Sequence, residues 1–499
     1  MTQDIQKTLE AYFHHQTFRP NQEEIIRDVV AGRDVLAVMA TGGGKSLCYQ
    51  LPAMMLDGMT VVISPLIALM KDQVDALSTQ GVRVETLNST QTYDERIRVE
   101  KEIAAGTVRI LYVSPERAVT SAFAATLSRC RVVLFAVDEA HCISMWGHQF
   151  RPEYREIKTL REKFPGVPVI ALTATATERV REDIVRELGM KNPREYVGSF
   201  NRKNLRYEVY EEPTGSIRVQ RIISYVVAHP NVSGIIYCFS RKSCEEIAER
   251  LRRSRILASP YHAGMPTPER SRIQEGFLNN TIRVICATIA FGMGIDKPDV
   301  GYVIHAHLPK DLESYYQETG RAGRAGGRAD CILYYSAGDR AKISSMLERE
   351  FSSAEKLRIA KQKLADMYSY CVTPGCRRKV LLSYFGEVIA PCGNCDRCDR
   401  SKPRAKPKPA AVPAGDLDKI VYDAARSLSG QMTVSSFVSF LLGLDRAHTK
   451  SSGLTSHRFY GAAGNYERSE VMGAVQDLIA AKKLCLKGNS VMKLCSAEK

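Results

Sequence analysis

One stretch, residues 35–47 with the sequence VLAVMATGGGKSL, constrains the fold of this chain more than any other. An apolar run from Val35 to Val38 leads into a glycine turn, and a helical pattern begins at Leu47. Consecutive glycines let several backbone N–H groups converge on one phosphate, and the helix N-terminus adds partial positive charge there. The order of strand, glycine turn and helix therefore predicts an α/β domain that binds a nucleotide. The three glycines are Gly42, Gly43 and Gly44.

Two side chains directly after the glycines have the types that phosphate chemistry needs. Lys45 is expected to reach the β- and γ-phosphates, and Ser46 is expected to ligate Mg²⁺. We also expect Thr41, just before the glycines, to border the phosphates. Met39 stands where the strict pattern G-x-x-x-x-G-K-[ST] has its first glycine. A flexible turn with a surface lysine is the alternative, but the flanking strand and helix favour the phosphate loop.

The bulk composition is that of a globular protein with a polyanionic partner. With 499 residues, 44% hydrophobic and 25% charged, the chain is long enough for three or four domains. The net charge of +15 favours nucleic acid, since no basic amphipathic helix suggests a membrane surface. The N-terminus lacks the basic and apolar regions of a secretion signal, and no apolar run reaches about 18 residues. We therefore expect a cytoplasmic, nucleoid-associated protein without a membrane contact.

Apolar runs alternate with helical patterns in two successive series. Near-continuous runs separated by helices indicate a buried parallel sheet, so two series predict two similar α/β domains, at 1–205 and 206–336. A polar boundary lies near residues 198–214. The runs of the first series are residues 60–65, 84–88, 109–115, 131–137 and 168–175, and those of the second are 232–240, 259–264, 282–290, 300–309 and 329–335.

The last third of the chain has a different character. Residues 337–400 read as helices followed by a cysteine-rich segment. Residues 401–415 contain four prolines, four basic residues and no acid, which predicts an extended basic linker. Residues 416–499 are expected to form a small domain with helices at 416–428 and 467–482 and a hairpin that turns at Gly488-Asn489.

Two acids directly follow the apolar run 131–137. Asp138 and Glu139 therefore end a predicted parallel strand, where side chains point into the crevice that binds ligands. Asp138 is placed to hold Mg²⁺ through water, and Glu139 to orient and deprotonate the attacking water. A pair of acids that caps a helix is the alternative, which the upstream phosphate loop disfavours.

A short turn about twenty residues before the phosphate loop is a candidate for base recognition. The amide of Gln22 offers the donor and acceptor that the N6/N7 edge of adenine requires. Arg19 and His15 are placed to stack on the two faces of the base. The competing interpretation is that Gln22 is an ordinary solvated helix residue.

Three polar residues near position 320 repeat at spacings of four and three. Gln317, Arg321 and Arg324 therefore share one helix face that enters a glycine-rich turn. In a two-domain ATPase such arginines reach the γ-phosphate from the second domain, with Arg324 as the leading candidate and Arg321 in support. Arginines that merely decorate a solvated face are the alternative.

Four of the fourteen cysteines have the spacing C-x15-C-x2-C-x2-C. Tetrahedral Zn²⁺ needs four thiolates, and C-x2-C turns deliver them in pairs, so we predict a closed, structural zinc site. Cys371 lies nearby and is interpreted as a bystander that could replace Cys376. The remaining cysteines are expected to be reduced packing residues. The predicted ligands are Cys376, Cys392, Cys395 and Cys398.

The order of these motifs resembles the superfamily 2 helicases, and most closely the RecQ helicases, from about Leu9 to the C-terminus. The matching segments are ATGGGKS at 40–46, SPLIALMKDQ at 64–73, DEAH at 138–141, CISMWGHQFRPEY at 142–154, LTATAT at 172–177, FGMGIDKP at 291–298 and YYQETGRAGR at 315–324. The resemblance implies two RecA-like domains, a helical zinc-binding module and a winged-helix domain. RecQ proteins often have an aromatic residue where His15 stands.

The resemblance also implies where DNA binds. Trp146, His148, Phe150 and Arg151 would sense single-stranded DNA, because aromatic faces stack on unpaired bases and arginine pairs with phosphate. The alternative is that Trp146 fills a core. The last domain resembles a winged helix whose candidate contacts with duplex phosphate are Ser456, His457, Arg458 and Tyr460.

We therefore expect an ATP-dependent DNA helicase that moves 3′→5′ on single-stranded DNA, with ATP, Mg²⁺ and Zn²⁺ as cofactors. Expected partners are single-stranded and duplex DNA, with single-stranded-DNA-binding protein as a candidate, and the expected state is a monomer. A DEAD-box RNA helicase has the same two ATPase domains. The loop that carries Trp146, Phe150 and Arg151 (the tryptophan loop) and the four-cysteine cluster argue against this alternative. A non-catalytic zinc and winged-helix protein is disfavoured by Lys45, Asp138, Glu139 and Arg324.

Overall fold

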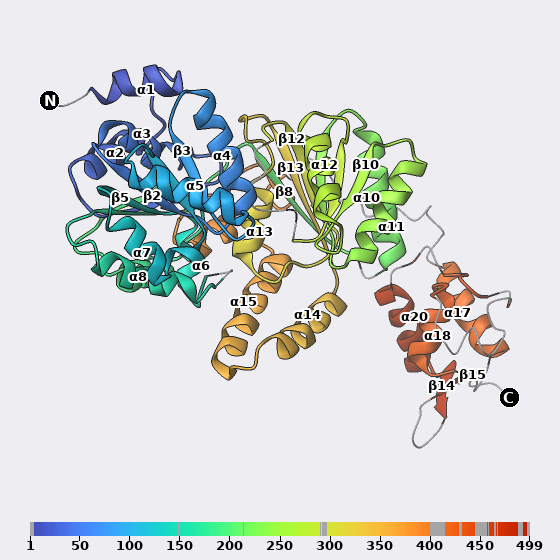
Figure 1. The fold of residues 1–499 in the computed structure, drawn as a ribbon. Coiled ribbons are helices and arrows are strands. Elements are labelled where there is room, and N and C mark those ends of the chain that lie inside the picture. Colours follow the sequence, from blue (N-terminus) through green and yellow to red (C-terminus); the bar gives the residue numbers. More distant parts are fainter. Residues whose placement is uncertain are drawn as a thin grey trace. The chain divides into compact units, whose positions relative to one another are not determined.

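The structure is a computed structural model of the whole chain (Figure 1). It describes residues 4–147, 150–212, 214–289, 291, 297–399, 415–428, 432–444, 457, 459–463, 466, 468–487 and 493–496. The chain divides into two compact units, residues 1–400 and 401–499. Among the described helices, none has the length and apolar character that a membrane span requires.

The first unit begins with a seven-stranded parallel sheet of order β3-β4-β2-β5-β6-β1-β7. Every run of the first predicted series is a strand, while β7 was not predicted. The strands are β1 (Val35–Val38), β2 (Met59–Ile63), β3 (Val84–Leu87), β4 (Ile110–Val113), β5 (Val132–Val137), β6 (Val169–Thr173) and β7 (Arg194–Val197). The helices are α1 (Ile5–Phe13), α2 (Gln22–Val30), α3 (Leu47–Met55), α4 (Ile67–Thr79), α5 (Tyr93–Ala104), α6 (Pro115–Ala118), α7 (Ser121–Leu127), the 3-10 helix η1 (Ala140–Ile143), α8 (Glu153–Glu162) and α9 (Glu178–Glu187).

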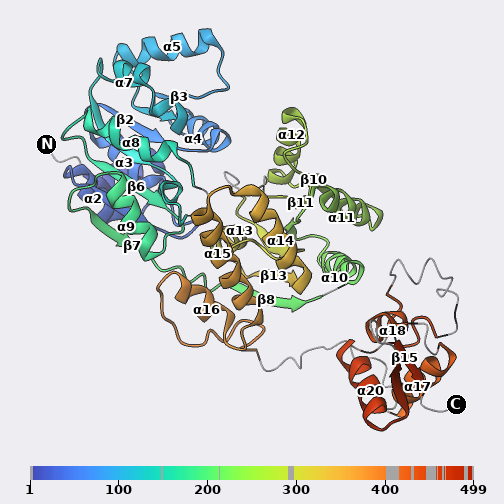
Figure 2. The same cartoon turned by 90° about the horizontal axis from the view of Figure 1, so that it is seen from below.

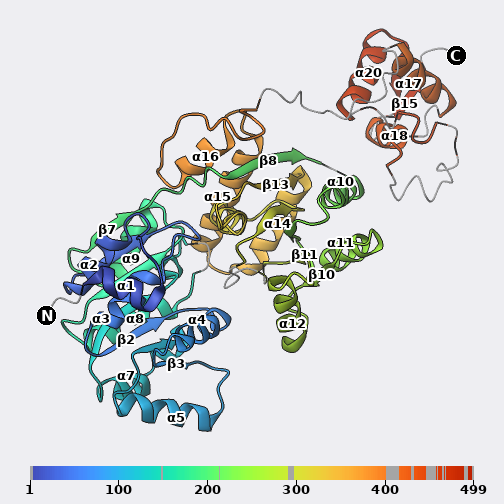
Figure 3. The ribbon, with the colours of Figure 1, turned by 90° about the horizontal axis from the view of Figure 1, so that it is seen from above.

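Both faces of this sheet are buried, which explains why its strands read as continuous apolar runs. Alternate residues of one strand enter different cores: Val35 packs with α2 and α3, whereas Leu36 packs with the helices of the opposite face. Such two-sided burial requires a helical layer on each side, and the α/β alternation of the sequence supplies both. Figure 1 shows α3 and α8 on opposite sides of the sheet, and Figure 3 views it from the side of α1.

The second sheet is also parallel and has six strands in the order β10-β11-β9-β12-β13-β8. All five runs of the second series are strands, so two parallel-sheet α/β domains are confirmed. The strand β8 lies in the predicted polar boundary and pairs along seven residues with β13. The elements are β8 (Leu205–Glu211), α10 (Gly215–Ala228), β9 (Ser233–Tyr237), α11 (Arg241–Arg253), β10 (Ala258–Tyr261), α12 (Thr267–Leu278), β11 (Val284–Ala287), β12 (Val300–His305), α13 (Leu312–Thr319) and β13 (Ala329–Tyr335).

A helical module follows the second sheet and packs against it on the β8 side (Figure 2). It consists of α14 (Ala337–Glu350), α15 (Ala354–Val372) and α16 (Arg377–Tyr384), followed by the cysteine-rich segment. One apolar cluster continues from the first sheet through the second sheet into this module, with Phe200 and Phe385 among its buried members. The buried apolar core of the first unit therefore includes residues of both sheets and of the helical module.

The second unit has its own core, to which Phe437 and Phe440 contribute buried rings. Both predicted helices and the two strands of the predicted antiparallel hairpin are present, while α18 was not predicted, and the turn at Gly488-Asn489 lies outside the described residues. The elements are α17 (Gly415–Ser427), α18 (Val434–Leu441), α20 (Arg468–Ala480), β14 (Leu484–Lys487) and β15 (Lys493–Ser496). The winged-helix assignment stays a prediction.

Close packing inside the second sheet domain gives a test of the fold. A Cβ atom on Gly234 would lie 1.9 Å from the ring of Tyr302, which is fully buried against Tyr225. Gly234→Ala should therefore destabilise the domain by about 1–3 kcal/mol. In Gly215→Ala the added Cβ has no atom within 4 Å, so this control should keep the melting temperature. Equal melting temperatures for the two variants would contradict the packing described.

Candidate nucleotide and nucleic-acid sites

The phosphate loop lies between the carboxyl end of β1 and the start of α3. Gly42 and Gly44 have φ angles of +81° and +78°, which L side chains rarely adopt. A Cβ atom on Gly44 would lie 2.4 Å from Nε2 of Gln22, so only glycine fits there. The buried Met39 contributes its backbone carbonyl, which accepts a hydrogen bond of 3.4 Å from Nζ of Lys45. The loop is thus a cradle of backbone with one cation at its end.

Asp138 and Glu139 lie at the carboxyl end of β5, two strands from β1 in the sheet order. Asp138 is buried; its carboxylate accepts hydrogen bonds from Ser64 Oγ at 3.3 Å and from the backbone N–H of Glu139 at 2.9 Å. Glu139 has a φ of +48°, a strained conformation for a non-glycine residue. Its Oε2 lies 3.2 Å from Nδ1 of His141, which also contacts Thr173 Oγ1 at 2.9 Å. The strained turn fixes the direction of both acids.

The two acids have different electrostatic environments. Burial, together with the charge of Glu139, raises the pKa of Asp138 to about 6. Burial also acts to raise the pKa of Glu139, but His141, Lys45 and Arg321 outweigh it and keep that pKa below the usual value. The surrounding cations therefore favour the ionised form of Glu139.

Arginines from the second sheet domain face the phosphate loop. Gln317 on α13 and Arg321 in the following turn are buried. The charge of Arg321 contributes to the lowered pKa of Glu139. Cγ of Arg324 would be 3.8 Å from a Cβ placed on Gly42. The helix α13 ends at Thr319, so the prediction that Arg321 and Arg324 share a helix face with Gln317 is wrong. Both arginines lie in the turn that follows the helix, and Arg324 borders Gly42 there.

The predicted base-recognition residues lie beside the glycines. Gln22 is buried; its Nε2 donates to the carbonyl of Gly44 at 2.9 Å, and its Oε1 accepts from the backbone N–H of Arg19 at 2.8 Å. The guanidinium of Arg19 donates to the carbonyl of Gly42. His15 is exposed. Gln22 is thus a bonded part of the phosphate-loop support, contrary to the solvated interpretation.

The rings of the tryptophan loop are covered by cations. The guanidinium of Arg179 lies 3.4 Å from the centroid of Trp146, and the ring of Phe150 has Arg155 and Lys356 each at 5.1 Å. Arg151 forms an ion pair of 3.3 Å with Glu116. His148 lies outside the described residues. Trp146 is half-buried, so its ring packs against the core and a cation at once.

Sequence reasoning missed a lysine that joins this loop to α13, the helix that leads into the turn with Arg321 and Arg324. Lys363 on α15 is buried, donates to the carbonyl of Trp146, and forms an ion pair of 2.8 Å with Glu313 on α13. A pocket of about 390 Å³ opens beside it, lined in part by Phe150 and Lys356. Neither Lys363 nor Arg179 belongs to a local sequence motif. The partners of Lys363, Trp146 and Glu313, are distant in sequence, as is Trp146 from Arg179, so only the fold brings these residues together.

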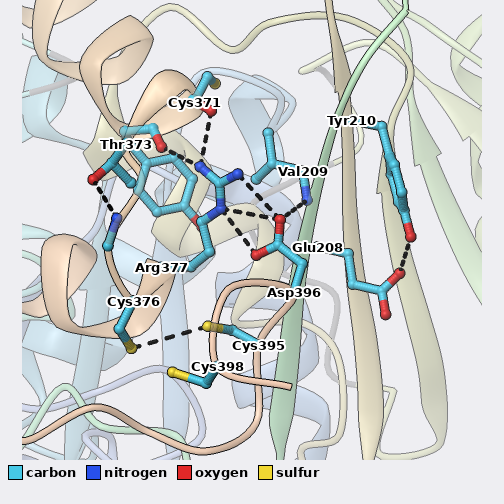
Figure 4. A network of polar contacts seen from close by, with 12 residues as sticks. Glu208, Val209, Tyr210, Cys371, Thr373, Cys376, Arg377, Cys395, Asp396 and Cys398 are labelled. Carbon is cyan, nitrogen blue, oxygen red and sulfur yellow. Dashed lines mark hydrogen bonds and ion pairs between the residues drawn. The ribbon is translucent and has the colours of Figure 1, made fainter. Parts of the chain in front are cut away.

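The four predicted cysteines converge at the edge of the helical module, and Figure 4 shows Cys376, Cys395 and Cys398 of this cluster. Their Sγ atoms all lie within 4.8 Å of one another, with 3.9 Å between Cys376 and Cys395 and 4.0 Å between Cys392 and Cys398. A tetrahedron with arms of about 2.3 Å has edges of about 3.8 Å, so the thiols fit Zn²⁺. A hydrogen bond with Cys392 and several backbone N–H groups lower the pKa of Cys395 to about 4, which favours a thiolate ligand. Cys371 is buried outside this cluster.

A buried arginine connects the cysteine cluster to the second sheet (Figure 4). Nε of Arg377 lies 3.0 Å from Asp396, and its Nη1 donates to the carbonyls of Tyr370 at 2.7 Å and Cys371 at 2.8 Å. The backbone N–H of Asp396 donates to the carbonyl of Tyr207 on β8 at 3.1 Å. The cysteine-rich segment therefore covers the exposed edge of β8.

In the second unit, two of the four predicted DNA contacts lie among the described residues. Nε2 of His457 lies 3.2 Å from Oγ of Ser427, and Tyr460 donates to the carbonyl of Gly443 at 3.1 Å. The ring of Tyr460 packs edge-on against Phe440, so it supports the core of this unit. Ser456 and Arg458 lie outside the described residues.

Comparison with known proteins gives the same class as the geometry. Three family models match the chain: DEAD/DEAH box helicase at residues 19–184, helicase conserved C-terminal domain at 218–326, and RecQ zinc-binding at 337–399. The structure is similar to S. cerevisiae Dbp5 bound to RNA and ADP BeF3 (TM-score 0.55, 16% identity, 72% of this chain and 97% of that chain). It is also similar to the DUF1998 helicase MrfA bound to DNA and AMPPNP (TM-score 0.57, 18% identity, 78% of this chain and 59% of that chain). The fold is therefore that of a two-domain helicase.

Sequence relatives identify the family within this class. The ATP-dependent DNA helicase RecQ of Pasteurella multocida is 46% identical over 391 residues, which are 78% of this chain and 61% of that protein. The RecQ of Bacillus subtilis is 43% identical over 401 residues, 80% of this chain and 67% of that protein. The chain belongs to the RecQ family. It spans about three fifths of the length of the Pasteurella and Haemophilus relatives.

The cysteine cluster leads to a metal-removal test. Purified protein should contain about one zinc per chain, and Cys395→Ser should lose it and lower the melting temperature, because bound metal supplies folding free energy. Cys371→Ser is the matched control, since this cysteine lies outside the cluster and should leave the zinc content unchanged. Metal analysis decides: a full zinc content in Cys395→Ser, or loss of zinc in Cys371→Ser, would contradict the ligand set.

Proposed function

We propose that this chain hydrolyses ATP between its two sheet domains and uses the cycle to move 3′→5′ along single-stranded DNA. It thereby unwinds duplex or branched DNA in recombination, repair and replication. The observation that supports this most strongly is the close approach of the two domains at the phosphate loop: Cγ of Arg324 would lie 3.8 Å from a Cβ placed on Gly42, and Oγ1 of Thr41 would lie 3.2 Å from a Cβ placed on Gly320. The names of the RecQ relatives support ATP as the fuel and DNA as the substrate.

The residues of the cleft have different proposed roles in phosphoryl transfer. Lys45 and the backbone of Thr41 to Gly44 hold the phosphates, and Arg324 with Arg321 stabilises charge on the γ-phosphate. Ser46 and Asp138 would hold Mg²⁺, which neutralises phosphate charge when it is bound. Glu139 orients the water and accepts its proton, while His141 keeps this carboxylate in place. Gln317 borders the same site from α13.

Binding of the adenine base is proposed to change the hydrogen bonds that support the phosphate loop. Gln22 reads adenine only after its amide exchanges the bonds that it makes to Arg19 and Gly44. The base would thereby release the loop from its support as the phosphates enter. Arg19 and His15 then border the base.

DNA is proposed to act through the tryptophan loop. An unpaired base would displace Arg179 from Trp146, and Phe150, His148 and Arg151 would complete the contact. The movement of the loop would reach α13 through Lys363, which is bonded both to the carbonyl of Trp146 and to Glu313. Since α13 leads into the turn with Arg321, DNA would thus favour closure of the cleft.

The remaining assignments follow the family. We assign two helicase domains to 1–205 and 206–336, a zinc module to 337–400, a basic linker to 401–415 and a winged helix to 416–499. Zinc is held by the four cysteines that converge, and His457, Arg458 and Tyr460 contact duplex DNA. We expect a cytoplasmic, nucleoid-associated monomer that meets single-stranded-DNA-binding protein on its substrate.

Two variants test the proposed ATPase site. Lys45→Ala removes the cation at the phosphates, and Glu139→Gln removes the base, so each should reduce DNA-stimulated ATP hydrolysis by about 100-fold or more. Glu139→Gln should still bind nucleotide because the glycine cradle is intact. The exposed Lys101→Ala is the control and should keep the wild-type rate. Near-normal turnover of Lys45→Ala or Glu139→Gln would contradict the proposed ATPase site. Stimulation of ATP hydrolysis by RNA and not by DNA would contradict DNA as the substrate.

The coupling of DNA binding to ATP hydrolysis is tested with Trp146→Ala. This substitution removes an aromatic face for base stacking and changes no residue that binds phosphate. This variant should keep its nucleotide affinity and its basal rate but lose most of the stimulation by single-stranded DNA, together with unwinding of a 3′-tailed duplex. Tyr93→Ala is the control, because this ring is 67% exposed on α5. The measurement is the ratio of ATPase rates with and without saturating DNA. A wild-type ratio in Trp146→Ala would mean that the ring only packs against the core.

A further inference from the structure

The segment between the two sheets, residues 198–204, is held in place rather than hinged along its length. The ring of Phe200 stacks on Phe385 of the helical module, with 4.8 Å between centroids and 15° between planes. The hydroxyl of Tyr316 on α13 donates to the carbonyl of Phe200 at 2.9 Å, and Glu387 accepts from its backbone N–H at 2.7 Å. This part of the segment therefore moves with the second sheet and its module.

Arg202 extends from this fixed segment into the cleft. Its Nη2 donates to the carbonyls of Ala322 at 2.9 Å and Gly323 at 2.7 Å, and its Nη1 donates to the carbonyl of Gly320 at 3.2 Å. These three carbonyls belong to the turn that presents Arg321 and Arg324. The guanidinium thus fixes the backbone of the turn from which both predicted fingers project.

The same guanidinium also reaches the first sheet domain. Nη1 of Arg202 donates to the carbonyl of Thr41, in the phosphate loop, at 3.3 Å. The two backbones are close here, since a Cβ on Gly320 would lie 3.2 Å from Oγ1 of Thr41. A planar fork with five N–H donors can serve carbonyls on both sides of the cleft, which one ammonium group cannot do.

A neighbouring residue supports the same turn without crossing the cleft. Nδ2 of Asn204 donates to the carbonyls of Gly323 at 2.9 Å and Gly327 at 2.7 Å. Both acceptors belong to the second sheet domain. Oδ1 of Asn204 also accepts a hydrogen bond of 3.3 Å from Nε of Arg202, while Nη1 and Nη2 of Arg202 make the bonds to the backbone carbonyls. Removal of the Asn204 side chain therefore tests the shape of the turn while the guanidinium can still reach Thr41.

We propose that Arg202 is a positioning residue that sets the arginine turn at the correct distance from the phosphate loop. This inference rests on the proposed ATP site in the cleft. Arg202 acts through backbone carbonyls, so it contributes to the transition state and not to the binding of the nucleotide. A small displacement of charged groups at a reacting phosphate has a large effect on rate, because their geometry is matched to the transition state.

The test compares Arg202→Met, Arg202→Lys and Asn204→Ala in the full chain. Arg202→Met should reduce kcat of DNA-stimulated ATP hydrolysis by about 10-fold to 100-fold. Equilibrium binding of a fluorescent ATP analogue and the melting temperature should stay near the wild-type values. Arg202→Lys should resemble Arg202→Met, since a single ammonium cannot join both backbones. Asn204→Ala should lose much less of kcat.

Three results would overturn the role of Arg202. The first is a kcat for Arg202→Met close to that of the wild type. The second is a loss of kcat that is accompanied by equal losses of nucleotide affinity and melting temperature. The third is an equal loss of kcat in Asn204→Ala, which would assign the effect to the shape of the turn. A wild-type chain without DNA-stimulated ATPase would instead contradict the proposed function.

Discussion

The parallel register of the first sheet is the constraint on which the candidate site depends. The strand order places β6 between β1 and β5, so the phosphate loop and the Asp138-Glu139 pair both emerge at the carboxyl edge. Two segments about a hundred residues apart in the chain thereby share one crevice. The charge of Lys45 acts to lower the pKa of both acids.

The second sheet domain completes the site because it is anchored to more than its own core. Its edge strand β8 is covered by the cysteine-rich segment, and α13 is joined to α15 through Glu313 and Lys363. A continuous apolar cluster binds these elements to the first sheet. The turn with Arg321 is consequently supported from several sides, and the zinc module contributes to the geometry of the cleft as well as to stability.

Electrostatics inside the cleft distinguishes groups that look alike in the sequence. Asp138 and Glu139 are neighbours, yet burial raises the pKa of the first, and cations hold the pKa of the second low. Similarly, Trp146 and Phe150 are both covered by cationic side chains. Such contacts have to be exchanged for nucleic acid if these rings stack on bases, which gives the loop two alternative partners.

The sequence by itself determined the features that depend on local patterns. A short stretch of sequence was enough to predict four features, because each depends on a few residues close together in the chain. These features are the glycines at 42–44, the acids after β5, the apolar runs of the two parallel sheets and the spacing of the cysteines. The tertiary structure alone decided the long-range pairings. The strand β8 lies in a stretch that reads as polar because it is an edge strand, with Glu208 and Glu211 along it. Arg202, Arg179 and Lys363 are ordinary surface-type residues in the sequence, and they acquire their roles only when packing brings distant carbonyls, rings and carboxylates within hydrogen-bond or ring-contact distance.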